Sequence, residues 1–87
     1  MKQLESEFNG RGEVKGSIFK RLLVGDKAYL YEVIDHETES IHYEVFKRKE
    51  NTYYNCISYP TSKAFGVWAW SYRNFVKATE KFNQIRD

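Results

Sequence analysis

Apolar and polar residues alternate in short runs through the middle of this chain, and a polar or turn-forming break follows each run. Alternation with a period of two predicts half-buried β-strands. Gly25-Asp26 fits a two-residue hairpin turn that begins with glycine, and Pro60, which cannot donate to a sheet ladder, ends the fourth run. The predicted strands are 14–24, 27–34, 41–49, 52–59 and 65–72.

The period changes near the end of the chain. Asn74 is a typical helix N-cap, and the residues after it place apolar side chains at the spacing of one helical face, at Phe75, Val76, Phe82 and Ile85. A helix over 75–86 is therefore expected to cover one sheet face. The predicted fold class is α+β: an antiparallel meander of four to five strands packed against one C-terminal helix.

The length of 87 residues leaves room for one core, which we place in residues 13–87. Residues 1–12 are mostly polar or glycine and read as a flexible leader, in which Phe8 could dock on the core. A domain of this size leaves apolar surface exposed, so a homodimer is one expectation.

Cys56 is the only cysteine, and no run of residues resembles a signal peptide or approaches the ~20 apolar residues of a membrane span. A cytoplasmic location without membrane contact is expected. With His36 and His42 as the only histidines, the chain contains no zinc-ligand spacing, catalytic motif or phosphate-binding glycine loop. We therefore expect a non-enzymatic binding module without a metal or another cofactor.

Charge is unevenly distributed along the chain. Six acidic residues and one lysine between Asp26 and Glu44 give a net charge of −5, whereas eight basic and two acidic residues between Val45 and Arg86 give +6. Part of this charge can pair across strands. The remainder predicts a bipolar molecule, with an acidic edge near the second hairpin.

Aromatic residues make up 17% of the chain, and several tyrosines lie near basic residues. Unpaired bases stack on exposed aromatic rings while lysine and arginine contact the phosphates. Single-stranded nucleic acid is therefore the first predicted partner, bound on a sheet face by Tyr29, Tyr31, Lys47, Arg48, Lys49 and Tyr53.

A host protein is the alternative partner. Tryptophan and arginine often dominate protein interfaces, and an acidic hairpin can mimic phosphate. The residues predicted to contact a protein are Asp35, Glu37, Glu39, Trp68 and Arg73.

The aromatic and small residues between Ser17 and Ile85 carry a resemblance, most clearly in the runs 43–46 and 64–72 and at Tyr59-Pro60. The chain resembles small uncharacterised proteins of bacteriophages and mobile elements of gut bacteria, a group with no assigned activity. That resemblance implies a host protein that is modulated or inhibited. Strands followed by one C-terminal helix are also similar in topology to single-stranded-DNA-binding transcriptional coactivators.

Overall fold

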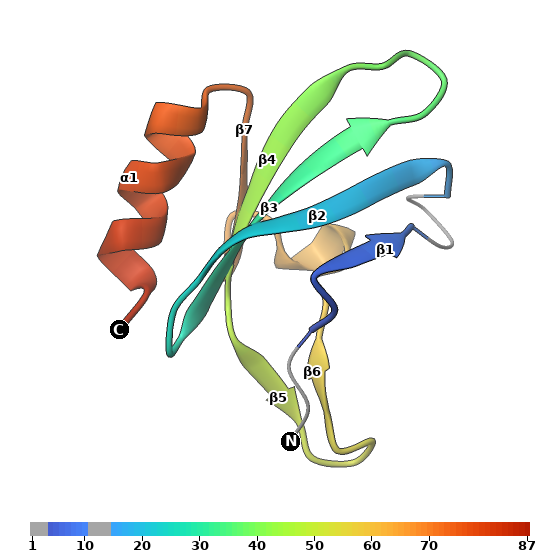
Figure 1. The fold of residues 1–87 in the computed structure, drawn as a ribbon. Coiled ribbons are helices and arrows are strands. Elements are labelled where there is room, and N and C mark those ends of the chain that lie inside the picture. The colour runs from blue at the N-terminus through green and yellow to red at the C-terminus, as the bar shows by residue number, and fades with distance from the viewer. Residues whose placement is uncertain (1–3, 11–14) are drawn as a thin grey trace.

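The computed structural model describes residues 4–10 and 15–87, which form a five-stranded antiparallel sheet, a two-stranded hairpin and one C-terminal helix (Figure 1). The strand order in the sheet is β1-β2-β3-β4-β7. These strands are β1 (Glu7–Asn9), β2 (Ser17–Val24), β3 (Ala28–Asp35), β4 (Ile41–Lys47) and β7 (Ala69–Tyr72). The other elements are the hairpin strands β5 (Lys49–Asn51) and β6 (Cys56–Ser58), the 3-10 turn η2 (Ser62–Ala64) and the helix α1 (Phe75–Ile85). The predicted α+β fold is confirmed.

Part of the predicted leader is a strand. β1 pairs antiparallel with β2 and places Phe8 opposite Phe19. The two rings stack with their centroids 4.9 Å apart, and Phe19 is fully buried. The prediction of a flexible leader is therefore wrong for residues 7–9, whereas the docking of Phe8 is confirmed. Residues 1–3 and 11–12 of that leader lie outside the described residues.

The first hairpin turn lies one residue later than predicted. The Gly25 N–H donates to the Ala28 carbonyl oxygen at 2.9 Å, so Asp26 and Lys27 form the turn. Gly25 is needed for a close approach between this turn and the end of the helix, and not for the turn itself. A Cβ at this position would lie 2.8 Å from the Cβ of Arg86, closer than real side chains approach, so glycine allows the end of the helix to lie against this turn.

The later strands are shorter than predicted. Residues 41–49 divide at Arg48 into the end of β4 and the start of β5, and residues 52–55 form a turn. Asn55 adopts a φ of +53° in this turn, a left-handed conformation that asparagine tolerates. β6 pairs with β5 and not with the main sheet. Of the predicted strand 65–72 only β7 forms, because Gly66, at a φ of +87°, lies in the turn that precedes it.

The helix begins as predicted and packs through Phe82 and Ile85, with Phe75 against Tyr43, but not through Val76. The Asn74 side chain accepts a hydrogen bond from the Lys77 N–H at 3.1 Å, which confirms the N-cap. Ala78 and Phe82 are buried against the sheet and Ile85 packs beside them. Val76 is 63% exposed and Phe75 is 44% exposed, so Val76 does not cover the sheet, because it lies off the face that Ala78 and Phe82 share.

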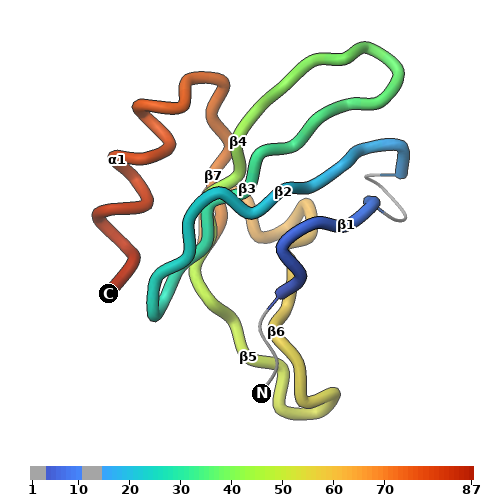
Figure 2. The backbone as a smooth tube through the Cα atoms, in the orientation of Figure 1, coloured from blue at the N-terminus to red at the C-terminus, as the bar shows by residue number. Residues whose placement is uncertain are grey.

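Both faces of the sheet are covered. Figures 1 and 2 show α1 on one side of the sheet and β6 and η2 on the other. The helix side buries Ala28, Leu30 and Val45 of the sheet. The opposite side carries a larger aromatic cluster. Its sheet residues are Phe8, Phe19, Tyr29, Tyr31, Val33, Phe46 and Ala69, and its cover includes Ile57, Tyr59 and Ala64.

Candidate functional site

Tyr29 and Tyr31 lie in the aromatic core with no exposed surface. The Tyr31 ring stacks on Phe46, and its hydroxyl donates to the Glu5 carbonyl oxygen at 2.6 Å. Burial raises the pKa of Tyr31 to about 12. The prediction that these two tyrosines stack bases on an open sheet face is therefore wrong. Alternation correctly places them on one face, but the β5–β6 hairpin and its neighbours cover that face.

The other residues predicted to bind nucleic acid lie at the junction of β4 and β5 and at the tip of the hairpin. Lys47 and Lys49 are exposed and Arg48 is partly buried, with its Nη2 3.6 Å from Glu50 Oε1. Tyr53 lies in the hairpin turn and is 86% exposed. The Lys47 N–H donates to the Trp68 carbonyl oxygen at 2.9 Å. This bond fixes Trp68, predicted as a protein contact, beside the basic segment.

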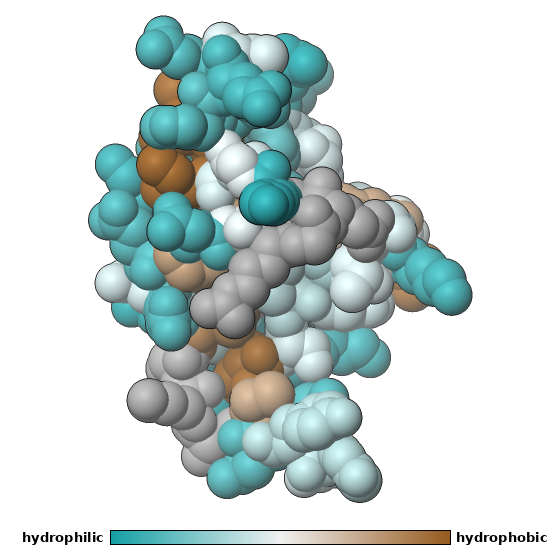
Figure 3. Space-filling model, turned by 90° about the vertical axis from the view of Figure 1, so that its right-hand side faces the viewer, coloured by the Kyte–Doolittle hydropathy of each residue, from teal (hydrophilic) through white to brown (hydrophobic). Residues whose placement is uncertain are grey.

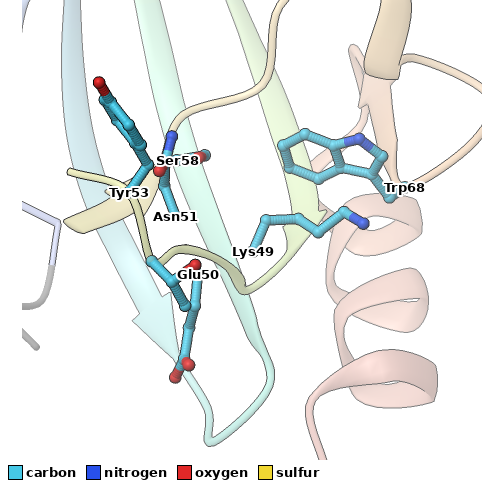
Figure 4. A pocket seen from close by; sticks show the side chains of 7 residues that line it. Lys49, Glu50, Asn51, Tyr53, Ser58 and Trp68 are labelled. Carbon is cyan, nitrogen blue, oxygen red and sulfur yellow. The ribbon is translucent and has the colours of Figure 1, made fainter. Parts of the chain in front are cut away.

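A shallow hollow of about 350 Å³, which we call the hairpin groove, lies between Tyr53 and Trp68 (Figure 4). It is lined by Lys49, Glu50, Asn51, Thr52, Tyr53, Ser58 and Trp68. The groove therefore joins residues that the sequence assigned to two different partners.

The register of the hairpin explains which side chains face the groove. Lys49 lies opposite Ser58, and Glu50 lies opposite Ile57. Ile57 points into the core and is only 5% exposed. Because side chains alternate along a strand, Lys49, Asn51 and Ser58 lie on the outer face.

The two aromatic walls differ in packing and exposure. Trp68 is partly buried, packs against the core and lies 6.5 Å from the Phe46 ring. The Lys49 ammonium lies 5.8 Å from the centroid of the Trp68 ring, within the range of a cation–π contact. Tyr53 and Tyr54, by contrast, contact each other edge to face and project from the turn, with Tyr54 73% exposed. One wall is therefore packed against the core, and the other is open to solvent.

Additional basic residues reach this end of the molecule from distant parts of the chain. The Arg48 N–H donates to the Lys27 carbonyl oxygen at 2.7 Å, and the Lys27 N–H donates to the Arg86 carbonyl oxygen at 2.9 Å. Three separate segments thus contribute a cationic residue near the start of the hairpin. Asp87, 3.6 Å from the Arg86 guanidinium, and Glu50 offset part of this charge.

The predicted protein contacts do not form one surface. β7 separates Trp68 from Arg73, because its first residue pairs with Phe46 and its last with Tyr43. Arg73 lies at the end of β4 that joins the acidic hairpin, and Trp68 lies at the other end. Glu37 and Glu39 are exposed in that hairpin, where the Asp35 carboxylate accepts hydrogen bonds from the Glu37 and Thr38 N–H groups.

Sequence reasoning missed Tyr54, Asn51 and Ser58. The polar run from Asn51 to Asn55 was the available signal, because asparagine at both ends of a short segment is typical of a turn. A turn there would have placed both neighbouring tyrosines at an exposed tip.

A buried carboxylate lies in β4, outside the lining of the groove. Glu44 is 6% exposed and accepts hydrogen bonds from the Tyr59 hydroxyl and, at 2.9 Å, from His42 Nε2. Burial, followed by the negative charge of Glu44, raises the pKa of the Tyr59 hydroxyl, so Tyr59 remains a donor. This contact joins β4 to the segment after β6, and its role is structural.

The described residues contain no group of three or more His, Cys, Asp or Glu side chains that could hold a metal ion. Within the same residues, no helix has the length and apolar character to cross a membrane. A comparison with protein families, with characterised proteins and with solved structures found no match to this chain. The resemblance to bacteriophage proteins therefore stays a prediction, and function is inferred from the residues of the chain itself.

Proposed function

We propose that this protein is a non-enzymatic binding module that binds single-stranded nucleic acid through the hairpin groove. The observation that carries the proposal is the pairing of Trp68 and the 86% exposed Tyr53 across a hollow that also contains Lys49. Every base has a π-face, so two aromatic walls suit an unpaired base of any sequence.

The charges beside the groove support the same ligand. Lys47 and Lys49 are exposed on either side of Arg48, where they can follow a phosphate backbone as its bases reach the groove. A base must leave its own stack to enter the hollow, and this favours a flexible single strand over a rigid duplex.

The charge of the whole protein suits moderate affinity. The net charge is +2, so long-range attraction to phosphate is weak and binding depends on local contacts. Affinity should therefore respond to the loss of a single aromatic residue.

Fluorescence anisotropy with a labelled mixed-sequence single strand at low salt tests the proposal. Tyr53→Ala should weaken binding by about 1–3 kcal/mol, the value of one stacked base, whereas Tyr53→Phe keeps the ring and should retain most of the affinity. Val76→Ala, at an exposed helix position, is the control for a remote truncation. Absence of binding by the wild-type protein, or equal binding by Tyr53→Ala, would overturn the proposal.

The alternative function is that of a small phage-type protein that binds a host protein and modulates or inhibits it. The carboxylates of Glu37 and Glu39 favour this alternative, since both are exposed in the β3–β4 hairpin. A Glu37→Gln, Glu39→Gln double variant should then lose a host protein that the wild type retains on a column. If both forms retain the same proteins, this hairpin is not the contact.

A further inference from the structure

The polar groups on the outer face of the hairpin groove offer mainly hydrogen-bond donors. The Oδ1 atom of Asn51 accepts a hydrogen bond from the Tyr54 N–H at 3.1 Å. A backbone N–H can only donate, so the amide atom that faces it must be the oxygen. The turn therefore fixes the orientation of the Asn51 amide and leaves its NH₂ group for other partners.

The neighbours of Asn51 strengthen this bias. Lys49, on the same face of β5, carries an ammonium that only donates hydrogen bonds. Ser58 carries a hydroxyl that can donate or accept. The one carboxylate that lines the groove, Glu50, projects from the other face of β5, and one of its oxygens lies 3.6 Å from Arg48. Figure 4 shows the Glu50 side chain directed away from Trp68 and Asn51.

Bases differ in what they offer to such a donor. Thymine carries a carbonyl acceptor, O4, where cytosine carries an amino donor, N4. Adenine is usually read by both atoms of an asparagine amide, through its N6 and N7. In this protein the Tyr54 N–H already occupies one lone pair of the Asn51 amide oxygen and holds the amide in the turn, which disfavours that two-atom contact.

We propose that Asn51 makes the hairpin groove prefer uracil or thymine over cytosine. The Asn51 NH₂ group donates to O4 of the base, the position at which cytosine carries its N4 amino group. The proposal rests on the nucleic-acid function proposed above and adds a base preference to it. Stacking on Tyr53 and Trp68 holds the base, and Asn51 discriminates among bases of equal size.

Competition between short oligo(dU) and oligo(dC) strands measures this preference. The two bases have the same ring size and differ mainly at C4, so a difference in affinity reports hydrogen bonding. The wild type should bind oligo(dU) about three- to tenfold more tightly, the effect of one net hydrogen bond.

Asn51→Asp provides the sharper measurement. The aspartate can still accept from the Tyr54 N–H, so the turn is retained, but its second oxygen replaces the NH₂ donor with an acceptor. The affinity ratio should then reverse in favour of oligo(dC). Asn83→Asp adds the same charge at an exposed position of α1 and should leave the ratio unchanged. The affinity ratio is the readout because an added negative charge weakens the binding of both strands alike.

The outcomes separate this inference from the proposed function. If the wild type binds oligo(dU) and oligo(dC) equally, or if Asn51→Asp leaves a dU preference intact, the role of Asn51 is overturned while nucleic-acid binding stands. If neither strand nor the mixed-sequence strand binds, the proposed function itself fails. The wild-type ratio alone decides the preference if the aspartate variant does not fold.

Discussion

At the scale of single residues, burying the Glu44 carboxylate costs free energy unless hydrogen bonds replace its hydration. A carboxylate that is 6% exposed has lost most of its hydration, and the Tyr59 hydroxyl and His42 Nε2 replace it. The aromatic cluster around Tyr59 fixes the position of that hydroxyl, since its ring contacts Phe19 and Phe46 at centroid distances of 5.0 and 5.3 Å. One polar contact thus depends on the packing of the core.

Removing the Tyr59 hydroxyl should expose this dependence. Tyr59→Phe leaves the buried Glu44 carboxylate short of a donor and should lower the free energy of unfolding by about 1–3 kcal/mol in a urea titration. Tyr54→Phe removes the same hydroxyl from a 73% exposed residue and should change stability by less than about 0.5 kcal/mol. Equal effects of the two variants would contradict the structural role of the Glu44 contact.

Asp35 predicts a pH effect confined to the β3–β4 turn. Hydrogen bonds from the Thr38 and Glu37 N–H groups lower the pKa of its carboxyl below the ordinary value of 3.8. A lowered pKa means that the carboxylate stabilises the folded turn at pH values above 3.8, and that this stabilisation is lost as the pH falls through the lower folded-state pKa.

Amide hydrogen exchange at Glu37 and Thr38 can follow this loss. After correction for the intrinsic pH dependence of exchange, protection of both amides should fall on acidification below about pH 3.8. Asp35→Asn cannot titrate and should show no such step. A step of equal size in that variant would assign the effect to another acid.

At the scale of whole elements, the packing of the helix on the sheet depends mainly on Phe82 and less on the number of apolar residues in α1. Phe82 is 4% exposed and Val76 is 63% exposed, although both are large apolar residues of α1. Phe82→Ala should lower the free energy of unfolding by about 3–5 kcal/mol, enough to unfold much of a domain of this size. Val76→Ala should change it by less than about 0.5 kcal/mol. Similar melting temperatures for Phe82→Ala and the wild type would show that the helix does not pack on the sheet in this way.

The elements also show which parts of this fold can be read from sequence. β2, β3, β4 and α1 were predicted close to their observed positions because each is long and has a regular period. The β5–β6 hairpin was not, because its strands are three residues long and the alternation of 52–59 continues through a turn. Periodicity carries no information on whether a run pairs with the main sheet or folds over it.

That single difference changed the candidate site. Tyr29 and Tyr31 could be placed on a common face from the sequence, but their burial depends on Ile57 and Tyr59, which reach them only after the hairpin folds back. Lys47, Arg48, Lys49 and Tyr53 were predicted as binding residues and lie at or beside the groove. Their proximity to Trp68 is a tertiary contact that no local pattern encodes.

At the scale of the whole molecule, part of the uneven charge of the sequence is separated in space, although the exposed Arg73 lies at the acidic end and Glu50 at the basic end. β4 spans about 20 Å at the usual rise per residue, with the acidic hairpin at its start and Lys47 at its end. Lys27 joins Lys47 at the basic end because its carbonyl oxygen accepts from the Arg48 N–H, and Arg86 joins them because its carbonyl oxygen accepts from the Lys27 N–H. A bound strand should therefore lie near the hairpin groove and avoid the β3–β4 turn, since phosphates are repelled by exposed carboxylates.

The salt dependence of binding measures this placement. For a single strand, the logarithm of affinity should fall by about 0.7 per logarithmic unit of salt for each phosphate contact. Lys47→Gln and Lys49→Gln should each reduce that slope by about 0.7, whereas Lys77→Gln, at an exposed position of α1, should leave it unchanged. Tyr53→Ala should lower affinity at every salt concentration with little change in slope, because stacking releases no counterions. If Lys77→Gln reduces the slope as much as Lys49→Gln does, the attraction is a diffuse property of the net charge, and the strand does not follow the basic segment beside the groove.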